Sequence, residues 1–236
     1  MTKKLKLHVL FMFSRFSCLI LAWLCTFSLT LYAAELKEEK ARYEAADKTL
    51  NEVFSELKKV MPAIRFEEMK KDQRAWVDYK TYMSDWVGGE KGQSSPDWWE
   101  MAASLTETRI PYLKAWKGVG EDFAWPGVYE DGRGGALYIE KKGDKLHFKV
   151  SVVRGPTYHM GDISGVLQVN DKRARFSDAG ANDKDTGEAW LDLKLIDGQR
   201  IELEATNAQT YHGARAYFDG IYLRVDAKGL IPKSEE

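Results

Sequence analysis

The sequence has little cysteine and little histidine. Both cysteines, Cys18 and Cys25, lie within the first 33 of its 236 residues, so a chain that loses this segment has neither a thiol nor a disulfide. Such a chain has no thiolate to bind zinc and no cysteine nucleophile. Its three remaining histidines, His147, His159 and His212, are far apart in sequence, so we predict no metal site.

The sequence also lacks the short motifs that mark common enzymes. There is no Gly-x-Ser-x-Gly elbow, no glycine-rich loop to cradle a phosphate and no His-Glu-x-x-His helix. Its 36 acidic residues slightly outnumber its 35 basic ones, and this balance disfavours nucleic acid as a partner. We therefore expect a protein with no catalytic residues, no cofactor and no nucleic-acid partner.

The first 33 residues have the order of a secretory signal. Lys3, Lys4 and Lys6 precede an apolar run from Phe16 to Leu31, and the small residues Ala33 and Ala34 follow. The alternative is a retained anchor, because a membrane-spanning helix needs roughly 17 to 20 apolar residues. We expect cleavage near Ala33 and a periplasmic or secreted protein, which would touch the membrane only through an uncleaved signal.

Cleavage at this point changes the charge of the chain. The removed segment has four basic residues and no acidic one, which leaves 31 basic against 36 acidic residues and a net charge of −5. An acidic surface of this kind suits a basic protein partner. The oligomeric state does not follow from the sequence.

Between residues 35 and 117 the apolar residues recur every three or four positions, which is the period of an amphipathic helix. Pro62 separates a first helix from a second, which Gly88-Gly89 should end. Ser95 and Pro96 suit the cap and the first turn of a third helix. Pro111 should kink this helix or split off its last turn. The helices are expected at residues 35–61, 63–87 and 96–117.

After residue 120 the pattern changes to short alternating runs broken by turn residues. Asp197-Gly198, between two such runs, is the strongest hairpin signal. About eight strands without helices predict an antiparallel β-barrel or sandwich. The strands are expected at 136–140, 146–150, 163–169, 173–177, 191–195, 201–204, 214–218 and 221–225. The polar loop from Asp178 to Gly187 should be the most mobile part.

The expected fold class is therefore α+β in two domains. An antiparallel three-helix bundle precedes an antiparallel barrel or sandwich. The expected division is a signal at 1–33, a helical domain at 34–120, a β domain at 121–227 and a polar tail at 228–236, with the boundary near residues 118–122.

Two loops of the β half combine a histidine with glycines and charged residues, one around His159 and one around His212. Loops on a rigid barrel often carry function, so the two would form one binding site if they converge. The alternative is that the charges tie the loops to the barrel and the glycines permit turns. The candidate binding residues are Arg154, Tyr158, His159, Asp162, His212, Arg215 and Asp219.

Three segments of the helical half share a pattern with a known family. They are Asp47-Lys48-Thr49-Leu50-Asn51, Gln73-Arg74-Ala75-Trp76-Val77-Asp78-Tyr79-Lys80 and Leu105-Thr106-Glu107-Thr108-Arg109. Over about residues 41 to 117 the chain resembles the lysozyme-inhibitor LprI-type family. The resemblance implies that Trp76 and Tyr79 pack the core and that four polar residues form a bracket between helices. These four are Asp47, Asn51, Gln73 and Arg109.

Members of this family often have one cysteine late in the second helix and another early in the third. Met83 and Met101 stand nearest to these positions here, so we expect the two methionines to meet across the helix pair. Trp98 and Trp99 point about 100° apart on a helix, so one of them covers the linker or barrel or is exposed for a partner.

The leading hypothesis is a non-enzymatic periplasmic protein that blocks a muramidase or related envelope target. Tyr158, His159, His212 and Arg215 would fill the cleft of a basic, lysozyme-like partner. The β half resembles the small barrel inhibitors of lysozyme but lacks their loop of serine, glycine and lysine before a tyrosine.

Two alternatives stay open. One is an envelope module that binds a ligand or partner without inhibition, which an aromatic-lined mouth near Tyr158 and Tyr211 would favour. The other is an enzyme, which would need His159 or His212 within hydrogen-bond reach of Asp162 or Asp219.

Overall fold

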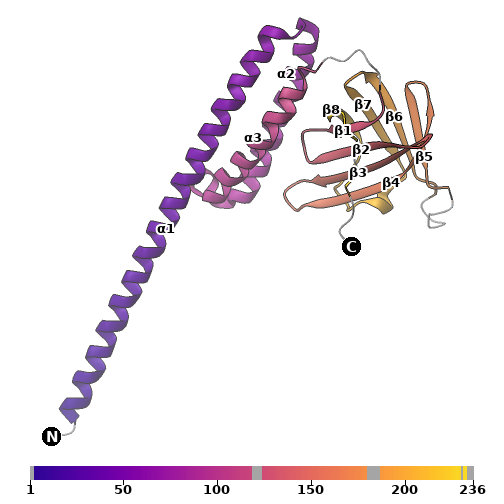
Figure 1. Ribbon diagram of the computed structural model, residues 1–236. Helices are drawn as coiled ribbons and strands as arrows, with labels where there is room; N and C mark the ends of the chain where they lie inside the picture. Colours follow the sequence, from indigo (N-terminus) through magenta and orange to yellow (C-terminus); the bar gives the residue numbers. More distant parts are fainter. Residues whose placement is uncertain (1–2, 119–123, 180–186, 230, 233–236) are drawn as a thin grey trace.

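The computed structural model describes residues 3–118, 124–179, 187–229 and 231–232, with side chains from Thr30 onward. Three helices are followed by a closed, eight-stranded antiparallel barrel (Figure 1). The predicted fold class is confirmed, and the β part is a barrel rather than a sandwich.

The helices are α1 (Lys3–Val60), α2 (Ala63–Gly88) and α3 (Pro96–Ala115), with a short 3-10 turn η1 (Gly89–Ser94) between the last two. Helix α3 packs against both α1 and α2, which hardly touch each other. Leu57, Met69, Trp76 and Leu113 are fully buried where the helices meet. The apolar stripes read from the sequence therefore form the helical core.

Helix α1 runs without a break through the expected cleavage point at Ala33. The Tyr32 hydroxyl donates a hydrogen bond to the Ser94 carbonyl oxygen, at 3.0 Å. Within the described part of the chain, no helix is long and apolar enough to cross a membrane. Cleavage near Ala33 stays a prediction.

The signals that the sequence gives for the ends of helices agree with the structure, with two exceptions. Gly89, directly after α2, has a positive φ of 54°, which glycine adopts without steric cost. Ser95 does not cap α3, because its hydroxyl donates to the Asp97 carboxylate instead of accepting from the backbone. Pro111 does not split off a last turn either: α3 continues to Ala115, and the buried Tyr112 next to it holds that turn in place.

The two adjacent tryptophans at the start of α3 both pack within the helical part. Trp98 is buried and its indole N–H donates to Asp85 at 2.7 Å, while Trp99 donates to the Gln93 carbonyl oxygen at 2.8 Å. Both rings also contact Tyr43 of α1. Among the described residues both tryptophans therefore pack against helices and not against the barrel, because α1 lies over this end of α3.

Each strand of the barrel pairs with the next, and the first pairs with the last. The strands are β1 (Gly127–Glu130), β2 (Gly135–Lys142), β3 (Lys145–Arg154), β4 (His159–Asn170), β5 (Arg173–Ser177), β6 (Trp190–Asp197), β7 (Arg200–Thr206) and β8 (Gly220–Asp226). The hairpin at Asp197-Gly198 is confirmed. Most of the 178–187 loop and of the 118–122 boundary lie outside the described residues.

Two strand assignments from the sequence need correction. The segment 214–218 is not a strand: Ala216 and Phe218 are buried against the end of the barrel, and Ala216 N–H closes a turn onto the Gly213 carbonyl oxygen. The eighth strand is instead β1, which the sequence analysis missed. Buried and more exposed side chains alternate in both segments, but only β1 forms hydrogen-bonded pairs with neighbouring strands.

The barrel interior is filled by side chains. Tyr129, Phe148, Phe218 and Tyr222 are fully buried there among aliphatic residues. Phe176 lies so close to Gly165 that a side chain at this position has no room. A filled barrel leaves its loops and outer wall as the surfaces that can bind another molecule.

The helices cover one side of the barrel, over β8. Leu223 of β8 is fully buried in the helical core. At one end of this contact Arg200 of β7 binds Glu68 of α2 at 2.9 Å, and its guanidinium lies over the buried Trp116 ring. Arg65 of α2 binds Asp197 of the barrel at 3.3 Å. Helices and barrel therefore share both apolar and charged contacts.

Candidate functional site

The antiparallel order brings four connections to one end of the barrel: β1–β2, β3–β4, β5–β6 and β7–β8. Within this set the loops of the two candidate histidines meet. Gly161 and His212 form a β-bridge, and Gly213 N–H donates to the Met160 carbonyl oxygen at 2.9 Å. The structure thus brings together the two loops that the sequence separates by about 50 residues.

Neither histidine is paired with an acid. The His212 ring packs edge-on against Phe218, and its Nδ1 lies 2.9 Å from the Gly213 carbonyl oxygen. His159 lies against Gly213. No hydrogen bond or ion pair joins either ring to a carboxylate in residues 3–118, 124–179, 187–229 and 231–232. The pairing of His159 or His212 with Asp162 or Asp219, which the enzyme alternative needed, is therefore not formed among these residues.

Arg154 is buried rather than offered to a partner. It forms an ion pair with Asp131 at 2.6 Å and donates to the carbonyl oxygens of Arg133 and Tyr217. Burial opposes its charge, but the neighbouring Asp131 outweighs this effect and raises the pKa of the guanidinium. Arg154 joins the β1–β2 connection to the 207–219 loop, which is the structural role that the sequence left open.

The two candidate aspartates bind their own surroundings. Asp162 lies on the outer wall of the barrel, where it accepts a hydrogen bond from the Ser151 hydroxyl at 2.6 Å and forms an ion pair with Lys149 at 3.2 Å. Asp219 accepts the Ala205 N–H at 3.0 Å. Neither side chain points into the meeting place of the two histidine loops, so both tie strands and loops together.

Tyr158 and Arg215 are the exposed members of the candidate set. Tyr158 is 58% exposed and has φ 52°, which is unusual for a residue with a side chain. Arg215 is exposed and makes no ion pair with a described residue. Two neighbours that the sequence analysis did not select, Met160 and Tyr217, are 69% and 46% exposed. Together these four residues give the barrel end an apolar and cationic surface.

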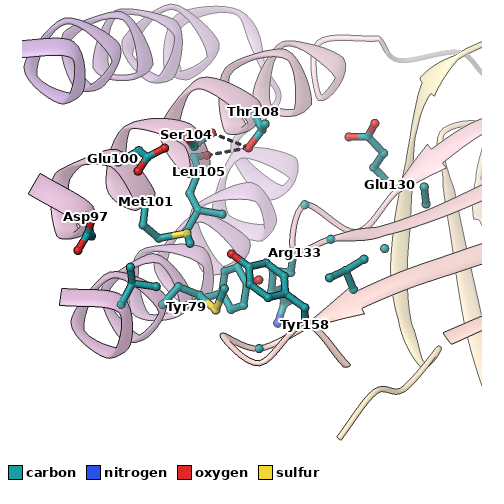
Figure 2. Close-up of a pocket in the computed structure, with 18 residues that line it drawn as sticks. Tyr79, Asp97, Glu100, Met101, Ser104, Leu105, Thr108, Glu130, Arg133 and Tyr158 are labelled. Carbon is teal, nitrogen blue, oxygen red and sulfur yellow. Dashed lines mark hydrogen bonds between the residues drawn. The ribbon is translucent and has the colours of Figure 1, made fainter. Parts of the chain in front are cut away.

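A cleft of about 720 Å³ lies beside these loops, between the helices and the barrel. Figure 2 shows Glu100, Met101 and Leu105 of α3 on one side, and Arg133 and Tyr158 of the barrel loops on the other. Its lining is mainly apolar. The apolar lining residues are Tyr79, Met83, Val87, Met101, Leu105, Ala136, Val153 and Tyr158.

The charged residues of the cleft are mostly acidic. Asp97, Glu100 and Glu130 face a single basic lining residue, Arg133. Glu130 is half-buried. Its carboxylate accepts no hydrogen bond from a described residue and forms no ion pair with one. Burial raises the pKa of its carboxyl group, and the negative Asp131 adds to this shift. Glu130 was not among the residues predicted from the sequence, because β1 was not predicted and neither the type of residue 130 nor its neighbours in sequence mark a site.

The expected polar bracket exists in part. Arg109 is fully buried, where its guanidinium lies between the Trp76 and Tyr112 rings and donates to Gln73 at 2.9 Å and to Asp72. Asp47 and Asn51 are not part of this cluster, because they bind each other one turn apart on the exposed face of α1. A bracket of all four residues is therefore wrong.

Arg109 also reaches the barrel. Its Nη1 lies against Gly132 in the β1–β2 connection, where a methyl group has no room. Arg133 of the same connection lies 3.9 Å from Asp72. A buried residue of the helical core thus determines where one wall of the cleft lies.

Comparison with known families finds a match in the helical part. Residues 34–113 match the family model Lysozyme inhibitor LprI. The expected resemblance is confirmed for this region, which contains α2, most of α3 and α1 from Ala34 onward. No curated protein and no solved structure matches the chain.

The cleft combines a wall from the region that matches the LprI model with a wall from outside that region. Tyr79, Met83 and Met101 are within residues 34–113, whereas Glu130, Arg133 and Tyr158 belong to the barrel. Trp76 is buried in the core as the resemblance implied, and Tyr79 packs at the edge of that core. Met83 and Met101 line the same cleft from α2 and α3, and a direct contact between them stays a prediction.

Proposed function

We propose that the protein is an exported, non-enzymatic inhibitor of the LprI type that binds and blocks a muramidase or a related envelope target. The match of residues 34–113 to the lysozyme-inhibitor family is the observation that carries this proposal. The signal segment, cleaved near Ala33, would deliver the chain to the periplasm or outside the cell.

The end of the barrel beside the cleft is the surface best suited to this task. Tyr158, Met160 and Tyr217 are exposed there, and exposed aromatic residues and methionines are enriched in protein interfaces. Arg215 is exposed next to them. A muramidase cleaves glycosidic bonds with a pair of carboxylates in an open cleft, and a cationic loop that enters this cleft would exclude the substrate.

The filled barrel supports action through loops rather than by a ligand held inside the barrel. The excess of acidic over basic residues in the expected mature chain would add long-range attraction for a basic lysozyme. This attraction weakens as salt is added, because exposed charges are screened within about 8 Å at physiological ionic strength.

The test is an inhibition assay with the exported protein against chicken-type and goose-type lysozymes. We expect slower hydrolysis of cell walls by at least one of these enzymes at micromolar protein. An absence of effect on both enzymes at that concentration would refute the proposed function.

A second candidate function is an envelope module that binds a ligand or partner without inhibition. The cleft of about 720 Å³ favours it, because ligand sites are concave, mostly apolar and about 300–1,000 Å³ in volume. Binding of a lysozyme or other envelope protein without loss of its activity would support this candidate over the inhibitor.

A further inference from the structure

The carboxylate of Glu130 lies at the seam between barrel and helices. Its strand neighbour Tyr129 points into the barrel, so Glu130 points outward. In the pairing of β1 with β8 it lies opposite Leu223, which is buried beneath the helices. In Figure 2 the carboxylate points from the barrel wall toward the helices. This acid is therefore held in the cleft by the sheet and not by a flexible loop.

No described residue satisfies this carboxylate. The nearest acid in sequence, Asp131, is already bound to Arg154 and to the N–H groups of Arg133 and Gly135. Arg133, the basic residue of the lining, forms a long ion pair with Asp72 of α2 at 3.9 Å and none with Glu130. A half-buried carboxylate without a donor is costly, and a bound cation would remove this cost.

The other walls of the cleft define what can accompany the cation. Met83 and Met101 supply adaptable thioether side chains from two helices, and Leu105 and Val153 supply branched aliphatic ones. Tyr158 adds an exposed ring at the barrel side. Asp97 and Glu100 add negative charge at the start of α3. An anionic group would be repelled, and an apolar group without a cation would leave Glu130 unpaired.

We propose that the cleft binds a lysine or arginine side chain of a protein partner, flanked by apolar side chains, with the Glu130 carboxylate as the acceptor for the cation. This inference rests on the proposed function for the identity of the partner, because a basic lysozyme-like protein offers such segments on its surface. The recognition itself depends only on charge and shape. The long stems of lysine and arginine pack along apolar surface while the charged end reaches an acid.

The test is methyl NMR of the exported protein labelled at its methionines, with two probe peptides. The blocked tripeptide Leu-Arg-Leu carries the expected pattern, and blocked Leu-Glu-Leu has the opposite charge. We expect the methyl signals of Met83 and Met101 to shift with the arginine peptide. The signals of Met61 and Met69, which are buried in the helical core, should stay in place.

Two variants test the role of the acid. Glu130→Gln removes the charge with little change in shape and should weaken binding of the arginine peptide about tenfold. Glu204→Gln makes the same chemical change at an exposed position on β7 and should leave binding unchanged. Unchanged Met61 and Met69 signals in Glu130→Gln verify that the variant is folded.

Three results would overturn the inference: no shift at Met83 and Met101, equal shifts with both peptides, or equal binding by the wild type and Glu130→Gln. The peptide experiment does not involve a lysozyme. A positive peptide result with a negative lysozyme assay would therefore refute the proposed function and leave the cation site standing. A negative peptide result with a positive lysozyme assay would refute the cation site and leave the proposed function standing.

Discussion

Asp131 and Arg154 form a buried ion pair at the end of the barrel beside the cleft, with 2.6 Å between Asp131 Oδ2 and Arg154 Nη1. Arg154 also binds the backbone of Arg133 and Tyr217, and Asp131 accepts two N–H groups of its own connection. This pair joins the β1–β2 connection, β3 and the 207–219 loop into one unit.

Asp131→Asn should therefore destabilise the protein strongly. The change leaves the Arg154 guanidinium buried without a counter-charge, which costs about 3 kcal/mol in the free energy of unfolding. Urea unfolding measures this loss. Asp192→Asn breaks the exposed pair with Arg175 and should have almost no effect. Equal small effects of both changes would contradict the structural role assigned to Asp131.

A pair of glycine substitutions tests the contact between Arg109 and the barrel. Gly132 and Gly143 have φ 70° and 61°, so alanine is strained at both, by about 1 kcal/mol. Only Gly132 also faces Arg109, whereas the space around Gly143 is open. Gly132→Ala should lower the free energy of unfolding by about 3 kcal/mol, and Gly143→Ala by about 1 kcal/mol. Equal losses would show that Arg109 does not constrain the β1–β2 connection.

The pH dependence of stability should report the environment of Glu130. Burial and then Asp131 raise the pKa of its carboxyl group in the folded state above the ordinary value of about 4.3. The fold therefore prefers the protonated acid and loses stability as pH rises through the interval above that value. Glu130→Gln should match the wild type below about pH 4 and be more stable at neutral pH.

The measurement is the free energy of unfolding of both proteins in urea between pH 4 and pH 8. Glu204→Gln, at an exposed site, supplies the control for loss of one charge. If the stability of Glu130→Gln falls relative to that of the wild type between pH 4 and neutral pH, the half-buried environment assigned to Glu130 is contradicted.

The helical part could be predicted closely because its signals are local. The apolar period and Gly88-Gly89 gave the second helix to within one residue at its end. The side-chain alternation of Leu191 to Leu195 likewise gave β6. Local signals failed where contacts with residues distant in sequence determine the structure. The segment 214–218 alternates like a strand but packs against the end of the barrel, and β1 has only four residues to show its pattern.

The candidate site could be predicted only in part for the same reason. Closure of the barrel brings the His159 and His212 loops together, and no residue in either loop encodes that closure. The cleft needs Met83 of α2 and Glu130 of β1 to line one cavity, which depends on the packing of α3 against β8. Sequence reasoning also selected Arg154 for its charge, whereas the structure buries that charge against Asp131.

The most direct test of the proposed inhibition compares two exposed arginines at opposite ends of the barrel in the lysozyme assay. Arg215 lies in the β7–β8 connection, which meets the His159 loop, and Arg173 begins β5 at the other end. The exported wild type should slow hydrolysis at micromolar concentration. Arg215→Ala should weaken inhibition about tenfold, and Arg173→Ala should inhibit like the wild type. No inhibition by the wild type, or equal inhibition by all three proteins, would contradict the account.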